Sequence, residues 1–293
     1  MITAEIDNKI KRVVSNIRNL PTPPIVFHQI QKVINDPGVS AEKVANILAE
    51  DPAMSVKVLR LTNSAFYGLA REIESVKQAV VIVGFEAIKN LVLSASVLDM
   101  FKGKNIDEEY QEKYWRHSLS TAFCCRLLAR RLRSRGMVDP DSAFSAGLLH
   151  DVGKMVICCF LPDEWKRYKA EREADTNSED FEIEERLFGF THSQVGGFLG
   201  TQWKIPHKLV EAITLHHHPQ LEEKKDPITY IVYLADYISK RAFYEEEEQH
   251  LIAEPDRSVM AYMAVNDDDL LNFDSELKAE YAKAETFMQI AGL

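Results

Sequence analysis

Histidine and aspartate residues gather in the second half of the chain, in contexts where they could hold a metal ion. Eight of the nine histidines lie after residue 116. The sharpest phrase is the doublet His150-Asp151, which follows the apolar run 143–149 and precedes Gly153 and Lys154. Neighbouring side chains on a helix diverge by about 100°. The doublet therefore needs a distorted helix end to direct both side chains at one ion.

Other candidate ligands stand in apolar segments of helical periodicity. They are His117, His192, the pair His216-His217, and Asp236. Any one of these histidines alone is more typical of a packed core or a surface position. Together with the His150-Asp151 doublet, the set holds five imidazoles and two carboxylates, which would be costly to bury unpaired, whereas a metal would satisfy them at once. The residues therefore favour a metal centre, with histidines satisfied by packing as the alternative.

Helices must position these side chains. Apolar residues recur at spacings of three and four, and strict alternation is hard to find, so the predicted fold class is all-α. Start signals come from proline at a first helical position and from capping side chains, at Pro52, Pro140, Pro206, Pro227, Ser40, Ser75 and Thr191. The helices expected to carry candidate ligands are 108–134, 140–160, 192–202, 206–217 and 227–243, and the last helix is expected at 274–290.

Three regions are predicted along the chain. A polar break at 102–105 separates an N-terminal helical half, 1–102, from a metal-binding half, 103–240. An acidic helical extension, 241–293, follows. The N-terminal half shows no candidate chemistry, because its single histidine, His28, is expected to be a surface or packing residue.

The charge is unevenly distributed. The 293 residues contain 35 Lys or Arg and 45 Asp or Glu, a net charge of −10, which argues against duplex nucleic acid as a partner. Residues 240–293 alone hold 5 basic and 13 acidic residues, a net of −8 that includes the runs 245–248 and 267–269. The other 239 residues therefore carry only −2. A small phosphate-bearing ligand is compatible with that part of the chain.

A basic stretch precedes the doublet. It contains Arg126, Arg130, Arg131, Arg133 and Arg135. A solvated basic face is one interpretation, and a site for an anionic ligand or an acidic partner is the other.

Composition predicts a cytoplasmic protein. Residues 1–10 have no apolar core of the kind that a secretory signal needs, and no apolar run approaches the roughly 18 residues of a membrane span. Neither cysteine pair, Cys124-Cys125 or Cys158-Cys159, has the Cys-x-x-Cys spacing of a zinc or redox site. We expect reduced thiols packed on helices, and no membrane partner.

Several phrases carry a family resemblance. The N-terminal half contains Leu20-Pro21, Asp-Pro-Ala-Met-Ser-Val-Lys-Val-Leu-Arg at 51–60, Thr-Asn-Ser-Ala-Phe-Tyr at 62–67 and Val-Val-Ile-Val-Gly at 80–84. The C-terminal half adds Gly-Leu-Leu-His-Asp at 147–151, Phe-Gly-Phe-Thr-His-Ser-Gln-Val-Gly at 188–196 and Trp-Lys-Ile-Pro at 203–206. Over about residues 17–240 the chain resembles the HDOD domain, within the HD superfamily of metal-dependent phosphohydrolases.

The resemblance implies a ligand set. One ion would be held by His117, His150, Asp151 and Asp236, and a second by His192, His216 and His217 as in the related HD-GYP phosphodiesterases, with Asp151 bridging the two. No Gly-Tyr-Pro follows the histidine pair, which disfavours cyclic di-GMP hydrolysis. Lys113 stands one turn before His117, where a carboxylate for a third ion could sit, so two ions at most are expected.

Such a centre would suit phosphoester hydrolysis. Two ions about 3.5–4 Å apart would activate water and stabilise charge on phosphate oxygens, with Asp151 as the shared ligand. Lys154 could contact a substrate phosphate as a point charge, or it could be a solvated lysine that helps to end its helix. Imidazole with carboxylate suits Fe, Mn, Ni or Zn better than Mg or Ca.

Three functions are compatible with the sequence. The resemblance favours a regulatory signal-transduction protein that retains the complete metal site and contacts a signalling partner through its N-terminal half. The ligand set favours an active phosphohydrolase or phosphodiesterase on a nucleotide or another small phosphoester. A metal-free structural scaffold is the third hypothesis.

Overall fold

The computed structural model describes residues 4–15, 20, 22–102, 104, 106–132, 138–222, 224, 226–244, 249–250 and 252–282. These residues form helices and no β-strand, which confirms the all-α fold class. Contacts between Cα atoms divide them into two compact units. Unit 1 comprises the described residues within 1–20 and 103–278, and unit 2 those within 21–102 and 279–282. The three functional regions expected from the sequence stay a prediction.

Unit 2 contains five helices. They are α2 (Ile25–Ile34), α3 (Ala41–Ala49), α4 (Pro52–Thr62), α5 (Val76–Val83) and α6 (Phe85–Met100). The predicted caps start three of them, since side chains of Ser40, Asp51 and Ser75 accept hydrogen bonds from backbone amides in the first turn. Apolar faces of α2, α3 and α4 close the core of this unit through residues such as Phe27 and Leu48, both fully buried.

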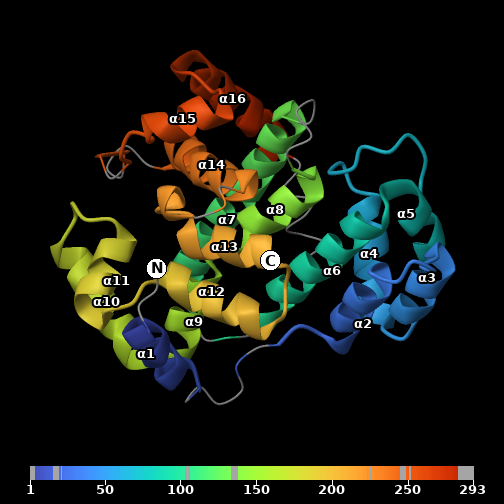
Figure 1. Ribbon diagram of the computed structural model, residues 1–293, viewed down its shortest axis with the longest axis horizontal. Coiled ribbons are helices and arrows are strands. Elements are labelled where there is room, and N and C mark those ends of the chain that lie inside the picture. The colour runs from blue at the N-terminus through green and yellow to red at the C-terminus, as the bar shows by residue number, and fades with distance from the viewer. Residues whose placement is uncertain are drawn as a thin grey trace. The chain divides into compact units, whose positions relative to one another are not determined.

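Unit 1 contains the remaining helices. They are α1 (Ala4–Ser15), α7 (Glu108–Arg131), α8 (Pro140–Leu149), α9 (Val152–Phe160), α10 (Pro162–Ala174), α11 (Asp180–Phe188), α12 (His192–Gln202), α13 (His207–Leu215), the 3-10 turn η2 (Pro219–Leu221), α14 (Pro227–Phe243), α15 (Arg257–Met263) and α16 (Asp267–Tyr281). The long helix α7 packs against α8 and α14, and α12 packs against α9 and α13 (Figure 1). All seven predicted ligands lie in these helices or at their ends.

The sequence prediction of one continuous helix over 140–160 is wrong. Helix α8 ends at Leu149, and Asp151 leaves helical geometry with φ −97° and ψ 9° before α9 begins at Val152. The Asp151 side chain makes no capping bond, because its oxygens face a lysine and several imidazoles instead. The break turns His150 and Asp151 toward one region, which an unbroken helix would not do.

A second difference concerns the last helix. It was expected at 274–290, but α16 begins at Asp267, and residues 283–290 lie outside the described part of the chain. Asn266 and Asp269 explain the earlier start, since each side chain accepts a hydrogen bond from the other's backbone amide. The acidic run 267–269 occupies the first turn, where negative charge favours a helix.

Residues Pro140–Phe160 correct another expectation. Despite its break, this stretch is long and apolar enough to cross a membrane by length and composition alone, but 78% of its apolar part is buried inside the protein. Val76–Val83 and Phe85–Met100 meet the same criteria only as a pair bent by 118°. Burial of this extent is typical of a core helix, as the packing of α8 against α7 requires.

In the basic stretch, Arg130 and Arg131 are exposed to solvent. Arg126 is buried, with its Nε 3.5 Å from Asp141 Oδ1, and Arg131 forms an ion pair with Glu276 of α16. Arg133 and Arg135 lie outside the described residues. The acidic extension therefore supplies a partner for one of these arginines. All four cysteines are free thiols; those of α7 are buried and those of α9 are partly exposed.

Candidate metal centre

Two groups of predicted ligands meet in unit 1, and the first gathers around His117. The Nε2 atom of His117 lies 3.0 Å from Asp236 Oδ1 and 3.3 Å from His150 Nε2. Asp151 Oδ2 is 3.7 Å from His117 Nε2 and 3.5 Å from His150 Nε2. These atoms come from α7, the α8–α9 break and α14. Three potential donor atoms, from His117, His150 and Asp151, thus cluster together, and Asp236 adjoins them through His117.

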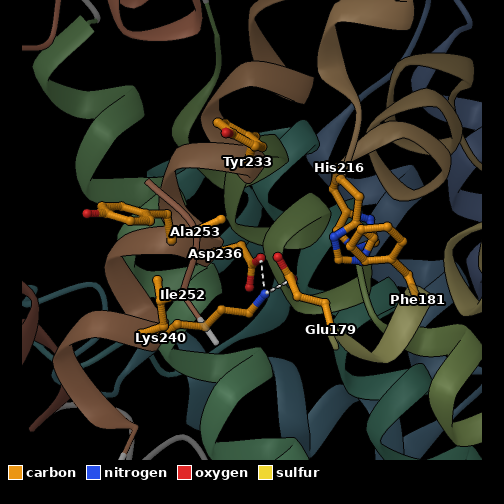
Figure 2. Close-up of a pocket in the computed structure, with 10 residues that line it drawn as sticks. Glu179, Phe181, His216, Tyr233, Asp236, Lys240, Ile252 and Ala253 are labelled. Carbon is orange, nitrogen blue, oxygen red and sulfur yellow. Dashed lines mark ion pairs between the residues drawn. The ribbon is translucent and has the colours of Figure 1, made fainter. Parts of the chain in front are cut away.

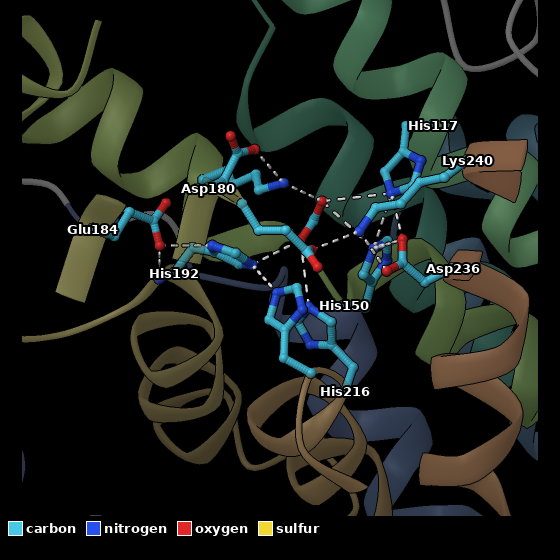
Figure 3. A network of polar contacts seen from close by, with 12 residues as sticks. His117, His150, Asp180, Glu184, His192, His216, Asp236 and Lys240 are labelled. Carbon is cyan, nitrogen blue, oxygen red and sulfur yellow. Dashed lines mark hydrogen bonds and ion pairs between the residues drawn. The ribbon is translucent and has the colours of Figure 1, made fainter. Parts of the chain in front are cut away.

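The second group gathers around the other oxygen of Asp151. Asp151 Oδ1 lies 3.0 Å from His192 Nε2 and 3.6 Å from His216 Nε2. His217 Nε2 is 3.0 Å from His192 Nε2. His192 comes from the first turn of α12, and the adjacent histidines follow the end of α13. Figure 3 shows His117 and Asp236 on one side of the network and His192 on the other.

Asp151 belongs to both groups. One of its oxygens faces the His117 group and the other faces the His192 group. Potential donor atoms of His117, His150 and Asp151 lie within 4.8 Å of one another, and so do those of Asp151 and the three histidines of the second group, whereas Asp236 is not part of the first cluster. A carboxylate divided in this way is the arrangement that a bridging ligand requires. All seven predicted ligands are therefore brought together, and their role as ligands stays a prediction.

Hydrogen bonds outside the two groups fix the orientation of the imidazoles. His150 Nδ1 donates to the carbonyl of Gly147 at 2.7 Å, and His216 Nδ1 donates to the carbonyl of Ile213 at 2.8 Å. A carbonyl only accepts, so the proton of each neutral ring lies on Nδ1. The Nε2 lone pairs are consequently free to bind a metal, as is usual for histidine ligands.

Burial keeps several of these imidazoles neutral. It lowers the pKa of His150 to about 3, and it lowers the pKa of His216 and, more strongly, that of His217. His192 differs, because the carboxylates of Glu184 and Asp151 outweigh burial and raise its pKa to about 9. In the absence of an ion, His192 is therefore protonated at neutral pH, whereas His150, His216 and His217 are neutral.

Unpaired buried atoms provide a test of whether a metal fits. Asp151 Oδ1, Asp236 Oδ1 and His216 Nε2 have no hydrogen-bond partner of acceptable geometry among the described residues. His150, Asp151, His192 and His216 are each at most 2% exposed. Leaving such atoms unsatisfied costs free energy, and all three converge on the two groups, so the donor set fits a metal centre.

Lys154 is not the solvated lysine of the alternative interpretation. Its side chain is 14% exposed, and Nζ lies 2.9 Å from Asp151 Oδ2 and 3.0 Å from Asp180 Oδ2. Burial opposes the charged form, but those two carboxylates outweigh it and hold the pKa of Lys154 well above its ordinary value. Lys154 is therefore a permanent cation and not a general acid or base near neutral pH.

A matching lysine escaped the sequence analysis. Lys240 Nζ lies 2.8 Å from Asp236 Oδ2 and 3.5 Å from Glu179 Oε2. Each lysine thus joins a candidate ligand carboxylate to one of two adjacent acids at the start of α11, Glu179 and Asp180. The spacing of Asp236 and Lys240, four residues apart on one helix, is the signal that could have revealed this pair.

Glu184 was also missed. Its Oε2 accepts hydrogen bonds from His192 Nδ1 at 2.7 Å and from the His192 backbone amide at 2.6 Å, and the residue is 3% exposed. It shares a face of α11 with Asp180 and the buried Phe188, each four residues from the next. Acidic residues at those spacings on the same face as a buried phenylalanine are a sequence signal for a carboxylate directed inward.

Comparisons with known proteins agree with this fold. A family model of the HDOD domain matches residues 20–219. An uncharacterised protein of Treponema pallidum is 22% identical over 246 residues, which are 82% of this chain and 47% of that protein, so this chain spans less than half of that relative's length. A solved HDOD domain protein of unknown function from Geobacter sulfurreducens is 26% identical, with a TM-score of 0.70. The superposition covers 97% of this chain and 95% of the Geobacter chain.

A second solved structure shows the same fold. This candidate phosphohydrolase from Shewanella amazonensis has a TM-score of 0.74 and 22% identity, covering 97% of this chain and 98% of its own. The family match extends over more than half of the sequence and includes the His150-Asp151 doublet and the pair His216-His217. The chain belongs to the HDOD domain family.

Proposed function

We propose that this HDOD protein is a metal-dependent phosphohydrolase acting on a small phosphoester. Two transition-metal ions, drawn from Fe, Mn, Ni and Zn, would be held by the His117 and His192 groups. The observation that carries the proposal is the division of Asp151, whose two oxygens face two separate sets of imidazoles. A single structural ion would have no use for both sets.

Bound ions would supply an activated water and stabilise negative charge on the phosphate. The residues of the chain supply positioning. Glu184 orients His192, while Lys240 holds one oxygen of Asp236 and leaves the other directed at His117. Lys154 and Lys240, both fixed as cations, would attract the substrate phosphate as point charges.

Charge explains why the ions would be needed for phosphate binding. The network holds five carboxylates, at Asp151, Glu179, Asp180, Glu184 and Asp236. Four cationic side chains oppose them, namely Lys154, Lys240, protonated His192 and Arg172, which lies 3.6 Å from Asp180. The empty network is therefore formally negative and repels a phosphate. Two divalent ions would reverse that sign even after His192 loses its proton.

The reaction balances without another reactant. The oxygen of water forms a bond to phosphorus as the ester P–O bond breaks. The proton lost by water is balanced by the proton that the leaving alkoxide gains, and the products are an alcohol and a phosphate of one fewer ester bond. No oxidant or second substrate is consumed.

Metal content tests the proposal first. Protein purified without oxygen should contain about two ions per chain, and His150→Ala and His216→Ala should each reduce that content. His207→Ala is the matched control, because the His207 side chain is 82% exposed and pairs with Glu211 outside the centre. Wild-type protein holding no more metal than His150→Ala would contradict the proposal.

Hydrolysis is tested next. Bis(p-nitrophenyl) phosphate and a panel of linear and cyclic nucleotides would be assayed with each of the four metals. We expect turnover with at least one metal, and its loss in Asp151→Asn. Metal-loaded protein that hydrolyses nothing in the panel would reject the enzyme.

A regulatory role is the second candidate function, and the division into units favours it. Both groups of potential metal donors found among the described residues lie in unit 1. On unit 2, Val56 and Val81 are 54% and 69% exposed on neighbouring helices, which would suit contact with a signalling partner. Binding of a phosphate-bearing ligand without turnover would support this role. A cytoplasmic location, and the lack of duplex nucleic-acid and membrane partners, stay predictions.

A further inference from the structure

A pocket adjoins the candidate metal centre on the side of Asp236. Figure 2 shows His216, Asp236 and Lys240 directed toward it, and His217 also lines it. One wall is thus formed by the edge of the centre itself. A group bound in the pocket would be next to any phosphate held by that edge.

Aromatic and apolar side chains form much of the rest of the pocket. They belong to Phe181, which lies beside His216 in Figure 2, and to Tyr233, Tyr237, Ile252 and Ala253. The Phe181 ring stacks on His217, with centroids 4.4 Å apart and planes 29° apart. The hydroxyl of Tyr233 accepts a hydrogen bond from the backbone amide of Asp256 at 2.8 Å, which anchors the ring in place. The aromatic walls are therefore held before any ligand arrives.

Such walls are unnecessary for binding phosphate alone. An anion is satisfied by cations and hydrogen-bond donors, and aromatic or aliphatic surface adds nothing to its binding. The same surface favours the faces and edges of a planar ring. Glu179 at the pocket edge could additionally accept a hydrogen bond from a ring N–H group.

We propose that this pocket is the subsite for a planar ring carried by the organic part of the substrate. The substrate class is then a phosphoester that ends in an aromatic or heteroaromatic ring, as in a mononucleotide, and not a sugar or glycerol phosphate. Phe181 and Tyr233 determine this specificity. The inference rests on the proposed function, because it assumes that the phosphate is held at the adjoining centre.

Calorimetric binding of two phosphonates to the metal-loaded full chain tests the subsite. Phenylphosphonate carries a ring and methylphosphonate does not, and neither has an ester bond to hydrolyse. We expect phenylphosphonate to bind about tenfold more tightly, within the range known for stacking on aromatic side chains. Tyr233→Leu and Phe181→Leu should each remove most of that preference while leaving the affinity for methylphosphonate unchanged.

Controls separate this inference from the proposed function. Tyr262→Leu, which removes a partly exposed ring outside the pocket, should leave the preference unchanged. Metal content is measured for every variant, because Phe181 touches a candidate ligand, and Tyr233→Leu avoids that contact. Equal affinities for the two phosphonates in metal-loaded wild-type protein would overturn the ring subsite and leave the centre standing. Survival of the preference in both pocket variants would also overturn it. Wild-type protein that holds no metal and binds neither phosphonate would overturn both proposals.

Discussion

Glu184 sets the protonation of His192 before any ion binds. Its carboxylate accepts from both the ring and the backbone of His192, and with Asp151 it raises the pKa of that imidazole to about 9. A metal ion needs the Nε2 lone pair, so it must displace the Nε2 proton below that pH. His150 poses no such competition, since its pKa is about 3. The two groups of ligands should therefore differ in how pH affects their affinity for metal.

Metal affinity of the His192 group should fall as pH falls. Below pH 9 His192 is mostly protonated. Each unit by which the pH falls should then weaken metal binding by up to about tenfold, or roughly a hundredfold from pH 8.5 to 6.5. Calorimetry of Mn²⁺ binding in buffers of different ionisation enthalpy would measure both the affinity and the protons released. About one proton should be released on filling this group at pH 7.

Glu184→Gln is the informative variant for this dependence. Without the carboxylate the pKa of His192 should fall, so the pH dependence of metal binding between 6.5 and 8.5 should flatten. Because the imidazole also loses the partner that orients it, the affinity for metal at pH 8.5 should drop by about 10- to 100-fold. Glu185→Gln, on the exposed face of the same helix, should behave as wild type. A slope equally steep in Glu184→Gln and wild type would show that Glu184 does not control the proton on His192.

At the scale of helices, a close approach between α9 and α12 places His192 against the doublet. A Cβ built on Gly153 would lie 1.9 Å from the carbonyl oxygen of His192 and 2.9 Å from the amide nitrogen of Gly196. Both neighbours are backbone atoms, which cannot rotate away as a side chain could. Only glycine therefore allows the two helices this separation.

Gly153→Ala should push α12 away from the break between α8 and α9. We expect the free energy of unfolding to fall by about 1–3 kcal/mol through overpacking, and the His192 group to lose metal before the His117 group does. Urea unfolding and metal content would measure the two effects. Gly38→Ala is the matched control, because its added Cβ would make only ordinary contact at 3.5 Å. Equal stabilities of the two variants would contradict the packing argument.

Local signals explain which helices could be predicted from sequence. Caps such as Asp51 and Thr191 act on amides two or three residues away, so sequence spacing is enough to find them. The break at Asp151 could not be found in this way, since it follows from α9 packing against α12 far along the chain. Lys240 and Glu184 were missed for a related reason. Lys240 contacts Glu179 and Glu184 contacts His192 only because tertiary packing brings separate helices together in one buried network.

The whole molecule separates its chemistry from half of its helices. Every candidate ligand, both lysines and the ring pocket belong to unit 1, while unit 2 contributes five helices and its own apolar core. The acidic extension of unit 1 is tied back to the same unit, through the ion pair of Arg241 with Asp274 at 2.9 Å and that of Arg131 with Glu276. Much of the chain's negative charge thus lies on a helix that packs apart from the candidate centre.

Metal binding should accordingly stabilise one unit and not the other. Filling buried sites stabilises whatever holds the ligands, by an amount that grows with ion concentration over Kd. Amide hydrogen exchange with and without Mn²⁺ should slow in α8, α9, α12, α13 and α14, and stay unchanged in α2 to α5. His150→Ala with His216→Ala should abolish the effect, whereas His207→Ala should preserve it. If Mn²⁺ slowed amide exchange equally in both units of the wild-type protein, the effect of metal binding would extend to unit 2. That result would favour a regulatory role through unit 2 over a hydrolytic centre that acts alone.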